Sequence, residues 1–208
     1  MSLRLLVVRH GETEYSRGRR FAGSRDVPLT AAGRRQAEAV AQALAGVAAT
    51  AVHSSPQARA LATAEIVAAP HGLTVTVEPD FREMAFGGWE GMSRDEVATR
   101  FPDGYRLWRE SPERAVPPGG ETLDAVARRV ARALAALRGR HPEGTVILVT
   151  HAVVVRLLVL GALGLGPERL WSVDATPAGI SELEYRDDWV TVHRINTLTH
   201  LAAEAAAP

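Results

Sequence analysis

Short, continuous apolar runs alternate with longer amphipathic stretches along this chain of 208 residues. Residues 3–8 and 145–150 are rich in apolar residues, with continuous apolar runs at residues 5–8 and 146–149, which is typical of strands buried on both faces of a sheet. Two shorter segments, at residues 50–53 and 74–77, are also strand candidates. Two further segments lie on either side of the polar turn at Asp187-Asp188 and resemble a hairpin. We expect strands at residues 3–8, 50–53, 74–77, 145–150, 180–185 and 189–195.

Helical spacing of apolar residues, together with residue types that begin helices, marks the stretches between these strands. Thr30 is an N-cap type, and Ala37, Val40 and Leu44 follow at helical intervals, so a helix is expected to about residue 45. Ser54-Ser55-Pro56 predicts a second helix to residue 67, with Pro56 at its first position. Further helices are expected after the capping-box pattern of residues 93–96, over 123–137, and after residue 151.

The alternation of strands and helices predicts one α/β domain over residues 1–208, long enough to bury a core. We expect a three-layer α/β/α architecture, with a mostly parallel central sheet that ends in an antiparallel edge. The Ala-rich tail, residues 201–208, is expected to be flexible. In such a sheet the ligand binds beyond the carboxyl ends of the strands. His10, the turn at 54–59 and His151 each follow a predicted strand, so the fold should bring them together.

Composition removes several functional classes from consideration. The net charge is zero, from 24 basic and 24 acidic residues, which gives no electrostatic reason to expect a nucleic acid or a membrane as partner. The chain contains no Cys, which excludes disulfides and thiolate chemistry. The apolar run at residues 5–8 is too short for a signal peptide, and residues 153–165 are too few to span a bilayer. We expect a cytoplasmic protein, and a homodimer stays open.

The residues at these strand ends suit the binding of a phosphate ester. A phosphate group needs planar, bidentate donors, which arginine supplies better than lysine does. Arg9 ends the first strand and Arg59 lies in the first turns of a helix. The backbone N–H of Ala152, at the start of the helix after His151, adds a donor of the kind that helix N-termini offer to anions.

Two histidines in one phosphate pocket allow a division of roles. A neutral His10 can attack phosphorus, while a protonated His151 offsets the charge of the transition state. Gly11 would let the backbone approach the phosphate closely, and neighbouring cations would keep His10 unprotonated. Glu83, in a loop after the third strand, is the candidate proton donor to the leaving group. Glu90 and Glu121 are alternative carboxylates, although Glu121 also fits a charge at a helix N-terminus.

These residues lie in segments that resemble the conserved blocks of a known family. In chain order the segments are Leu6-Val7-Val8-Arg9-His10-Gly11-Glu12-Thr13, Asp26-Val27-Pro28-Leu29-Thr30 with Gly33, Ser54-Ser55-Pro56-Gln57-Ala58-Arg59, Phe81-Arg82-Glu83 with Phe86-Gly87-Gly88-Trp89-Glu90-Gly91, Pro118-Gly119-Gly120-Glu121-Thr122, and Val149-Thr150-His151. They are similar to the blocks of the histidine phosphatase superfamily, the phosphoglycerate mutase-like proteins. They occur in the family's order and span nearly the whole chain.

The resemblance implies that His10 is phosphorylated, that Glu83 is the proton donor, and that Arg9, Arg59 and His151 bind the phosphate. It also implies that the reaction requires no metal and no cofactor. Ser16 stands where many members carry an Asn whose amide contacts the phosphate, and a hydroxyl has a shorter reach. Phe21-Ala22-Gly23 partly resembles the mutase branch, which makes Ala22 and Gly23 candidate substrate contacts.

The resemblance favours a phosphatase acting on a small phosphate ester. The alternatives are a cofactor-dependent phosphoglycerate mutase and a non-catalytic phosphate-binding module. Residues 94–118 are expected to form a lid over the leaving group. One or two of its arginines are expected to bind a carboxylate or a second phosphate of the substrate; the candidates are Arg94, Arg100, Arg106, Arg109 and Arg114. The other histidines fit no metal-ligand spacing. The tryptophans are expected to pack in the interior, with Trp108 a candidate for the pocket mouth.

Overall fold

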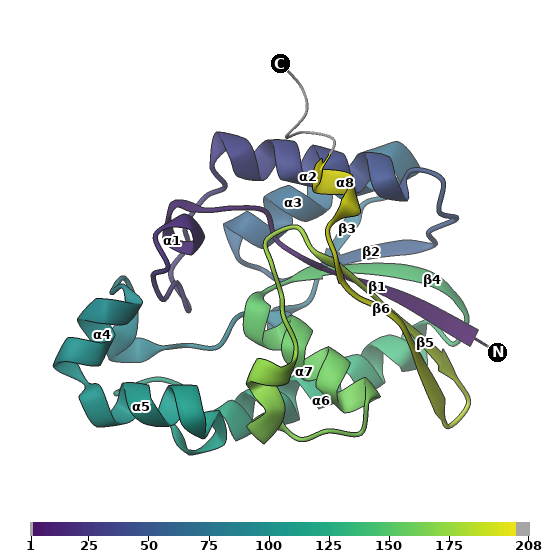
Figure 1. Cartoon of the computed structure of the whole chain (residues 1–208). Helices are drawn as coiled ribbons and strands as arrows, with labels where there is room; N and C mark the ends of the chain where they lie inside the picture. The colour runs from purple at the N-terminus through teal and green to yellow at the C-terminus, as the bar shows by residue number, and fades with distance from the viewer. Residues whose placement is uncertain (1, 203–208) are drawn as a thin grey trace.

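A mixed six-stranded sheet lies at the centre of the computed structural model, which describes residues 2–202 (Figure 1). The strands are β1 (Ser2–Arg9), β2 (Ala51–Ser54), β3 (Val75–Val77), β4 (Gly144–Thr150), β5 (Ile180–Arg186) and β6 (Trp189–Thr197), in the spatial order β3-β2-β4-β1-β5-β6. The pairs β3–β2, β2–β4 and β4–β1 are parallel, and β5 and β6 add antiparallel pairs. The predicted parallel sheet with an antiparallel edge is confirmed.

Helices cover both faces of this sheet. They are α1 (Glu14–Arg17), α2 (Ala31–Leu44), α3 (Ala58–Ala68), α4 (Arg94–Arg100), α5 (Pro102–Glu110), α6 (Leu123–Arg140), α7 (Ala152–Ala162) and α8 (Thr199–Ala202). In Figure 1, α2 and α3 lie on one face and α6 and α7 on the other. Within β1, Leu6 and Val8 pack on the side of α2 and α3, whereas Leu5 and Val7 pack on the side of α6 and α7. The three-layer architecture is therefore confirmed.

The predicted helix starts at Thr30 and Ser93 are correct, because each capping side chain belongs to the residue before its helix. The predicted start of the helix after residue 54 is wrong, because its cap comes from a residue far away in the sequence. The Thr30 hydroxyl accepts from the Gly33 N–H at 2.9 Å, and Ser93 opens α4 with a full capping box. Pro56 does not occupy the first position of α3, because Gln57 has extended backbone dihedrals as the N-cap and the helix begins at Ala58. The N–H of Ala58 is satisfied by the carboxylate of Asp26 at 2.7 Å, a partner that is distant in the sequence.

The first two residues of the predicted flexible tail are helical. Leu201 and Ala202 end α8, and Leu201 packs against the core on the side of α2 and α3. The rest of that segment, residues 203–208, lies outside the described residues.

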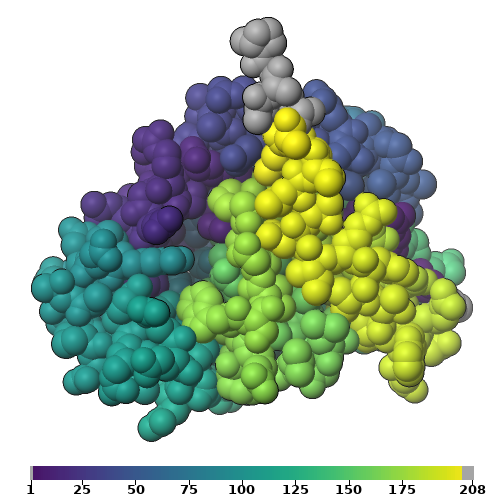
Figure 2. All heavy atoms as spheres, in the orientation of Figure 1, coloured from purple at the N-terminus to yellow at the C-terminus, as the bar shows by residue number. Residues whose placement is uncertain are grey.

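Backbone pairing brings the ends of three neighbouring strands together. Arg9 of β1 pairs with Thr150 of β4, and the N–H of His10 donates to the Thr150 carbonyl at 2.9 Å. On the other side of β4, the N–H of Ser55 donates to the Val149 carbonyl at 3.0 Å. The expected meeting of the segments after β1, β2 and β4 is confirmed. The surface is hollowed near where the purple N-terminal segment, the teal helices α4 and α5 and the green α7 region meet (Figure 2).

Candidate active site

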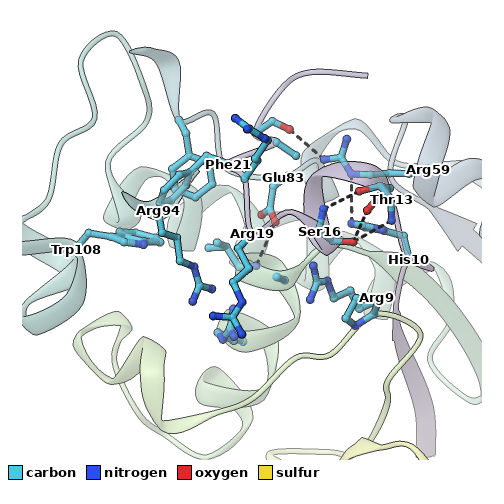
Figure 3. Close-up of a pocket in the computed structure, with 18 of the residues that line it drawn as sticks. Arg9, His10, Thr13, Ser16, Arg19, Phe21, Arg59, Glu83, Arg94 and Trp108 are labelled. Atoms are coloured by element: carbon cyan, nitrogen blue, oxygen red, sulfur yellow. Dashed lines mark hydrogen bonds between the residues drawn. The ribbon is translucent and has the colours of Figure 1, made fainter. Parts of the chain in front are cut away.

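A cavity of about 190 Å³ lies beyond these strand ends and is lined by six arginines and a single carboxylate, that of Glu83. Most of the residues expected at the site line it: Arg9, His10, Ser16, Ala22, Gly23, Arg59, Glu83 and Ala152. In Figure 3, His10, Arg9 and Arg59 lie on one side and Arg94 and Trp108 on the other. The excess of positive charge indicates a site for an anion.

The hydrogen bonds of His10 fix which ring nitrogen can act as a nucleophile. His10 is 4% exposed, and its Nδ1 lies 2.7 Å from the carbonyl oxygen of Gly11. A carbonyl only accepts, so Nδ1 carries the proton and Nε2 keeps its lone pair. Burial lowers the pKa of His10 well below its ordinary value, and the charges of Arg59 and Arg9 lower it further. Both effects favour the expected neutral imidazole, and burial is the larger of the two.

Arg59 is held by backbone groups so that it faces His10. Its Nη1 and Nη2 donate to the carbonyls of Arg25 and Gly23 at 2.7 and 3.0 Å, and its Nε donates to His10 Nε2 at 3.3 Å. The arginine is fully buried, although it carries a positive charge. The glycine at position 23 has a separate structural reason, because its φ is +52° and a Cβ there would overlap the Glu90 side chain.

Gly11 serves helix packing in addition to any role in phosphate binding. A Cβ at this position would overlap the carbonyl oxygen of Gly33 in α2. The reverse is also true, because a Cβ on Gly33 would overlap the carbonyl oxygen of Glu12. The Gly11 N–H donates to the Thr63 hydroxyl at 3.1 Å. The segment that carries His10 is thus clamped between α2 and α3.

His151 lies beside His10 but does not itself line the cavity. The two ring centroids are 5.1 Å apart, and His151 Nε2 lies 2.6 Å from the hydroxyl of Ser55. Burial lowers the pKa of His151 well below its ordinary value, and Arg59, His10 and Arg9 lower it further. In the absence of a phosphate this buried and positively charged environment favours the neutral ring, and the protonation of His151 against a bound phosphate stays a prediction.

Arg9 brings a buried positive charge to the pocket, and its guanidinium is only partly hydrogen-bonded. Its Nη1 donates to the Ala175 carbonyl at 2.6 Å, whereas its buried Nε has no hydrogen-bond partner within the described residues. Burial and the charge of Arg156 lower the pKa of Arg9 to about 10. An unpaired buried donor of this kind is costly unless an anion accepts from it.

Of the three candidate carboxylates, only Glu83 lines the cavity. Its Oε1 accepts from the Met84 N–H at 2.9 Å, and its Oε2 accepts a longer bond of 3.4 Å from Val153 in the first turn of α7. Glu90 is bonded to the hydroxyl and N–H of Ser24. Glu121 directly precedes Thr122, the N-cap of α6, as expected, and it also forms an ion pair with Arg129 at 2.9 Å.

The hydroxyl of Ser16 reaches the pocket but is already hydrogen-bonded. Its Oγ accepts from the Thr13 N–H at 2.9 Å and lies 3.0 Å from the Thr13 carbonyl oxygen, to which it donates. These bonds complete the capping box of α1. The expected phosphate contact by Ser16 would have to compete with this cap.

Sequence reasoning did not find Arg19, Arg20 and Arg156 as pocket residues. All three line the cavity together with Arg94, the predicted lid arginine that reaches it. Arg20 is paired with Glu96 at 2.8 Å. Arg156 is a lone cation in the apolar helix α7, which is the signal that could have identified it. Its Nε donates to the Val173 carbonyl at 2.9 Å, and the charge of Arg94 is among those that lower the pKa of Arg156. Within residues 2–202, Arg19 and Arg94 have no hydrogen-bond or ion-pair partner for their guanidinium groups.

The remaining expectations for the lid and the tryptophans had mixed outcomes. Trp108 lines the cavity as predicted, whereas Trp189 is 73% exposed and does not pack in the interior. Arg106 lies near acidic residues of its own helix, Asp103 and Glu110, and faces away from the cavity lining.

Within residues 2–202, no group of three or more His, Cys, Asp or Glu side chains could hold a metal ion. No described helix is long and apolar enough to cross a membrane.

Comparison with known proteins gives a consistent result. The family model described as Histidine phosphatase superfamily (branch 1) matches residues 5–198. Phosphoserine phosphatase 1 of Hydrogenobacter thermophilus is 32% identical over 96% of this chain and 94% of its own length. Bifunctional protein Rv2228c of Mycobacterium tuberculosis is 38% identical over 95% of this chain, which spans 55% of that relative. The solved structure of Bacillus stearothermophilus YhfR superposes with a TM-score of 0.90 at 30% identity, over 96% of this chain and 99% of that one.

Proposed function

This chain belongs to the histidine phosphatase superfamily, branch 1, and we propose that it hydrolyses phosphate monoesters through a phosphohistidine intermediate on His10. The observation that carries this proposal is the state of the His10 ring. Its Nδ1 is committed to the Gly11 carbonyl, which leaves the Nε2 lone pair in a pocket lined by six arginines. This is the arrangement that an imidazole nucleophile requires.

In the first step, His10 Nε2 attacks phosphorus, and the bond from phosphorus to the leaving oxygen breaks. Glu83 gives its proton to that oxygen, so an alcohol departs. Arg9 and Arg59 offset the charge on the phosphoryl oxygens, and His151, whose ring lies 5.1 Å from that of His10, is placed to assist them. In the second step, Glu83 takes a proton from water, which attacks phosphorus, and inorganic phosphate leaves with His10 restored.

The substrate we propose is a small phosphorylated metabolite that carries a second anionic group. Arg19, Arg94 and Arg156 line the pocket in addition to Arg9 and Arg59, which already suffice for one phosphate. Three further guanidinium groups near one another repel unless an anion lies between them. The relative named phosphoserine phosphatase acts on a substrate with a carboxylate, which agrees with this proposal.

Residues 94–118, which contain α4 and α5, are proposed to act as a lid over the leaving group, because Arg94 and Trp108 in this segment line the pocket. A cytoplasmic location and a homodimer stay predictions from the sequence.

Hydrolysis of p-nitrophenyl phosphate in the presence of EDTA tests the proposed function. We expect full activity with EDTA, no activity in His10→Ala, and wild-type activity in the control His193→Ala, an exposed histidine on β6. No turnover of this substrate or of a broad phosphate-ester panel between about pH 4 and 8 would leave a non-catalytic binding module as the better interpretation. Interconversion of phosphoglycerates that depends on bisphosphoglycerate would show a mutase instead.

A further inference from the structure

A second cavity, of about 200 Å³, adjoins the first under the helices of the proposed lid. It is lined by Arg94, Tyr105, Trp108, Arg109 and Trp171. Arg94, Trp108 and Trp171 also line the first cavity, so the two spaces meet along these side chains. In Figure 3, Arg94 and Trp108 lie on the side of the pocket opposite His10. The second cavity is therefore the space next to the phosphate site on the side of the proposed lid.

The boundary between the cavities is an aromatic surface that is held rigidly. The indole N–H of Trp171 donates to the Trp108 carbonyl at 2.7 Å, and the two rings are perpendicular with centroids 5.2 Å apart. The guanidinium of Arg156 lies 5.1 Å from the Trp171 ring centroid. Despite these contacts, Trp171 is 41% exposed. An indole that is already ordered and still exposed binds a flat ring with little further loss of side-chain entropy.

The outer part of the second cavity offers hydrogen-bond donors without acidic residues. Tyr105 and Arg109 lie on α5 and line only this second cavity. Within residues 2–202, the guanidinium of Arg109 has no ion-pair or hydrogen-bond partner. Arg106, on the same helix, lies near Asp103 and Glu110 instead. Donors beside a flat aromatic surface suit a ring with a polar rim, either a sugar or a heterocycle.

We propose that this cavity is an outer subsite for the leaving group, and that the preferred substrates are phosphate monoesters of two-ring alcohols. The first ring of the alcohol occupies the phosphate pocket, and the second lies against Trp171 with its polar rim at Tyr105 and Arg109. This inference rests on the proposed function, because it concerns the alcohol that His10 displaces.

Two matched substrate pairs test the subsite. No member of either pair carries the second anionic group proposed above, so the two members of a pair differ by one ring and not by charge. Ribose 5-phosphate and adenosine 5′-monophosphate differ by a heterocycle, and glucose 6-phosphate and trehalose 6-phosphate differ by a second sugar ring. We expect kcat/KM for the longer member of at least one pair to exceed that of the shorter by about tenfold, the scale of one ring stacked on an aromatic side chain. Arg109→Ala and Tyr105→Phe should reduce this ratio towards one, mainly through KM, and should leave the shorter substrates unchanged. The control Arg106→Ala should preserve the ratio.

A ratio near one for both pairs in the wild-type protein would overturn the subsite. So would an equal loss on short and long substrates in Arg109→Ala. The heterocycle pair and the sugar pair together show which kind of ring is preferred. Failure of the proposed function is a separate result, because an inactive protein would hydrolyse neither member of either pair nor p-nitrophenyl phosphate.

Discussion

The glycine pair that clamps the nucleophile segment allows a quantitative prediction for Gly11→Ala. A Cβ on Gly11 would overlap the Gly33 carbonyl oxygen and would lie 3.0 Å from its carbon and 3.2 Å from the Gly33 Cα. Ordinary contacts between carbon atoms are about 3.5–4.0 Å. All of these neighbours are backbone atoms, which no side-chain rotation can move. The start of α2 and the segment from His10 to Gly11 must therefore separate by on the order of 1 Å.

This displacement should affect both folding and catalysis. Overpacking of a buried contact costs about 1–3 kcal/mol, and in a domain of this size each 1 kcal/mol lowers Tm by about 2–4 °C. His10 is the adjacent residue, and a displacement of about 1 Å of a reacting group can reduce the rate by about 10²-fold. We expect Gly11→Ala to lose both stability and kcat, with the loss of kcat persisting at temperatures where the variant is fully folded.

Urea unfolding and steady-state kinetics on p-nitrophenyl phosphate measure the two effects. Gly46→Ala is the matched control, because a Cβ at Gly46 would meet no heavy atom within 4 Å. We expect the control to stay within about 0.5 kcal/mol of the wild type. A Gly11→Ala protein with the stability and kcat of the wild type would refute the reasoning, because the clamp would then have no consequence for His10.

Three further variants test other parts of the account. Glu83→Gln should reduce kcat/KM by about 10²–10⁴ for alkyl phosphates and much less for p-nitrophenyl phosphate, whose leaving group departs without a proton. Arg156→Ala should raise KM for 3-phosphoglycerate by about tenfold relative to glycerol 3-phosphate, which lacks the carboxylate. His53 contacts Glu78 and His141, and burial lowers its pKa. The unfolded chain therefore binds a proton at His53 more readily than the folded chain, and the free energy of unfolding should decrease as the pH falls below roughly 6.5. In His53→Gln the slope of unfolding free energy against pH should decrease by up to about 1.4 kcal/mol per pH unit between pH 6.5 and 5.

Each of these expectations has a clear counter-result. Equal losses of Glu83→Gln on alkyl and nitrophenyl esters would argue against proton donation by this residue. Equal KM changes for both three-carbon substrates would remove Arg156 from recognition of the second anion. An unchanged pH slope in His53→Gln, measured by urea unfolding across that range, would show that His53 does not take up the proton.

The sequence predicted the architecture well because the signals for strands and helices are local. The uninterrupted apolar runs of β1 and β4 and the caps at Thr30 and Ser93 each depend on residues a few positions apart. The start of α3 was misplaced because its first N–H is capped by Asp26, a partner that only the folded chain brings near.

The candidate site was predicted in part for the same physical reason. Strand ends are local features, so the meeting of His10 with the segments after β2 and β4 followed from the topology. The pKa of His151 could not be predicted from the sequence, because it depends on burial and on charges from several elements. Arg156 was not predicted because the rest of its helix is apolar and typical of a buried helix. Only the fold shows that this one cation lines the pocket.

The central claim, covalent phosphorylation of His10, is tested most directly by trapping the intermediate. The enzyme is quenched in alkali during turnover of a ³²P-labelled ester, and the labelled peptide is identified by mass spectrometry. The account predicts an acid-labile, alkali-stable phosphoryl group on His10, absent in His10→Ala and present in His193→Ala. Label on His151, or sustained turnover by His10→Ala, would contradict it.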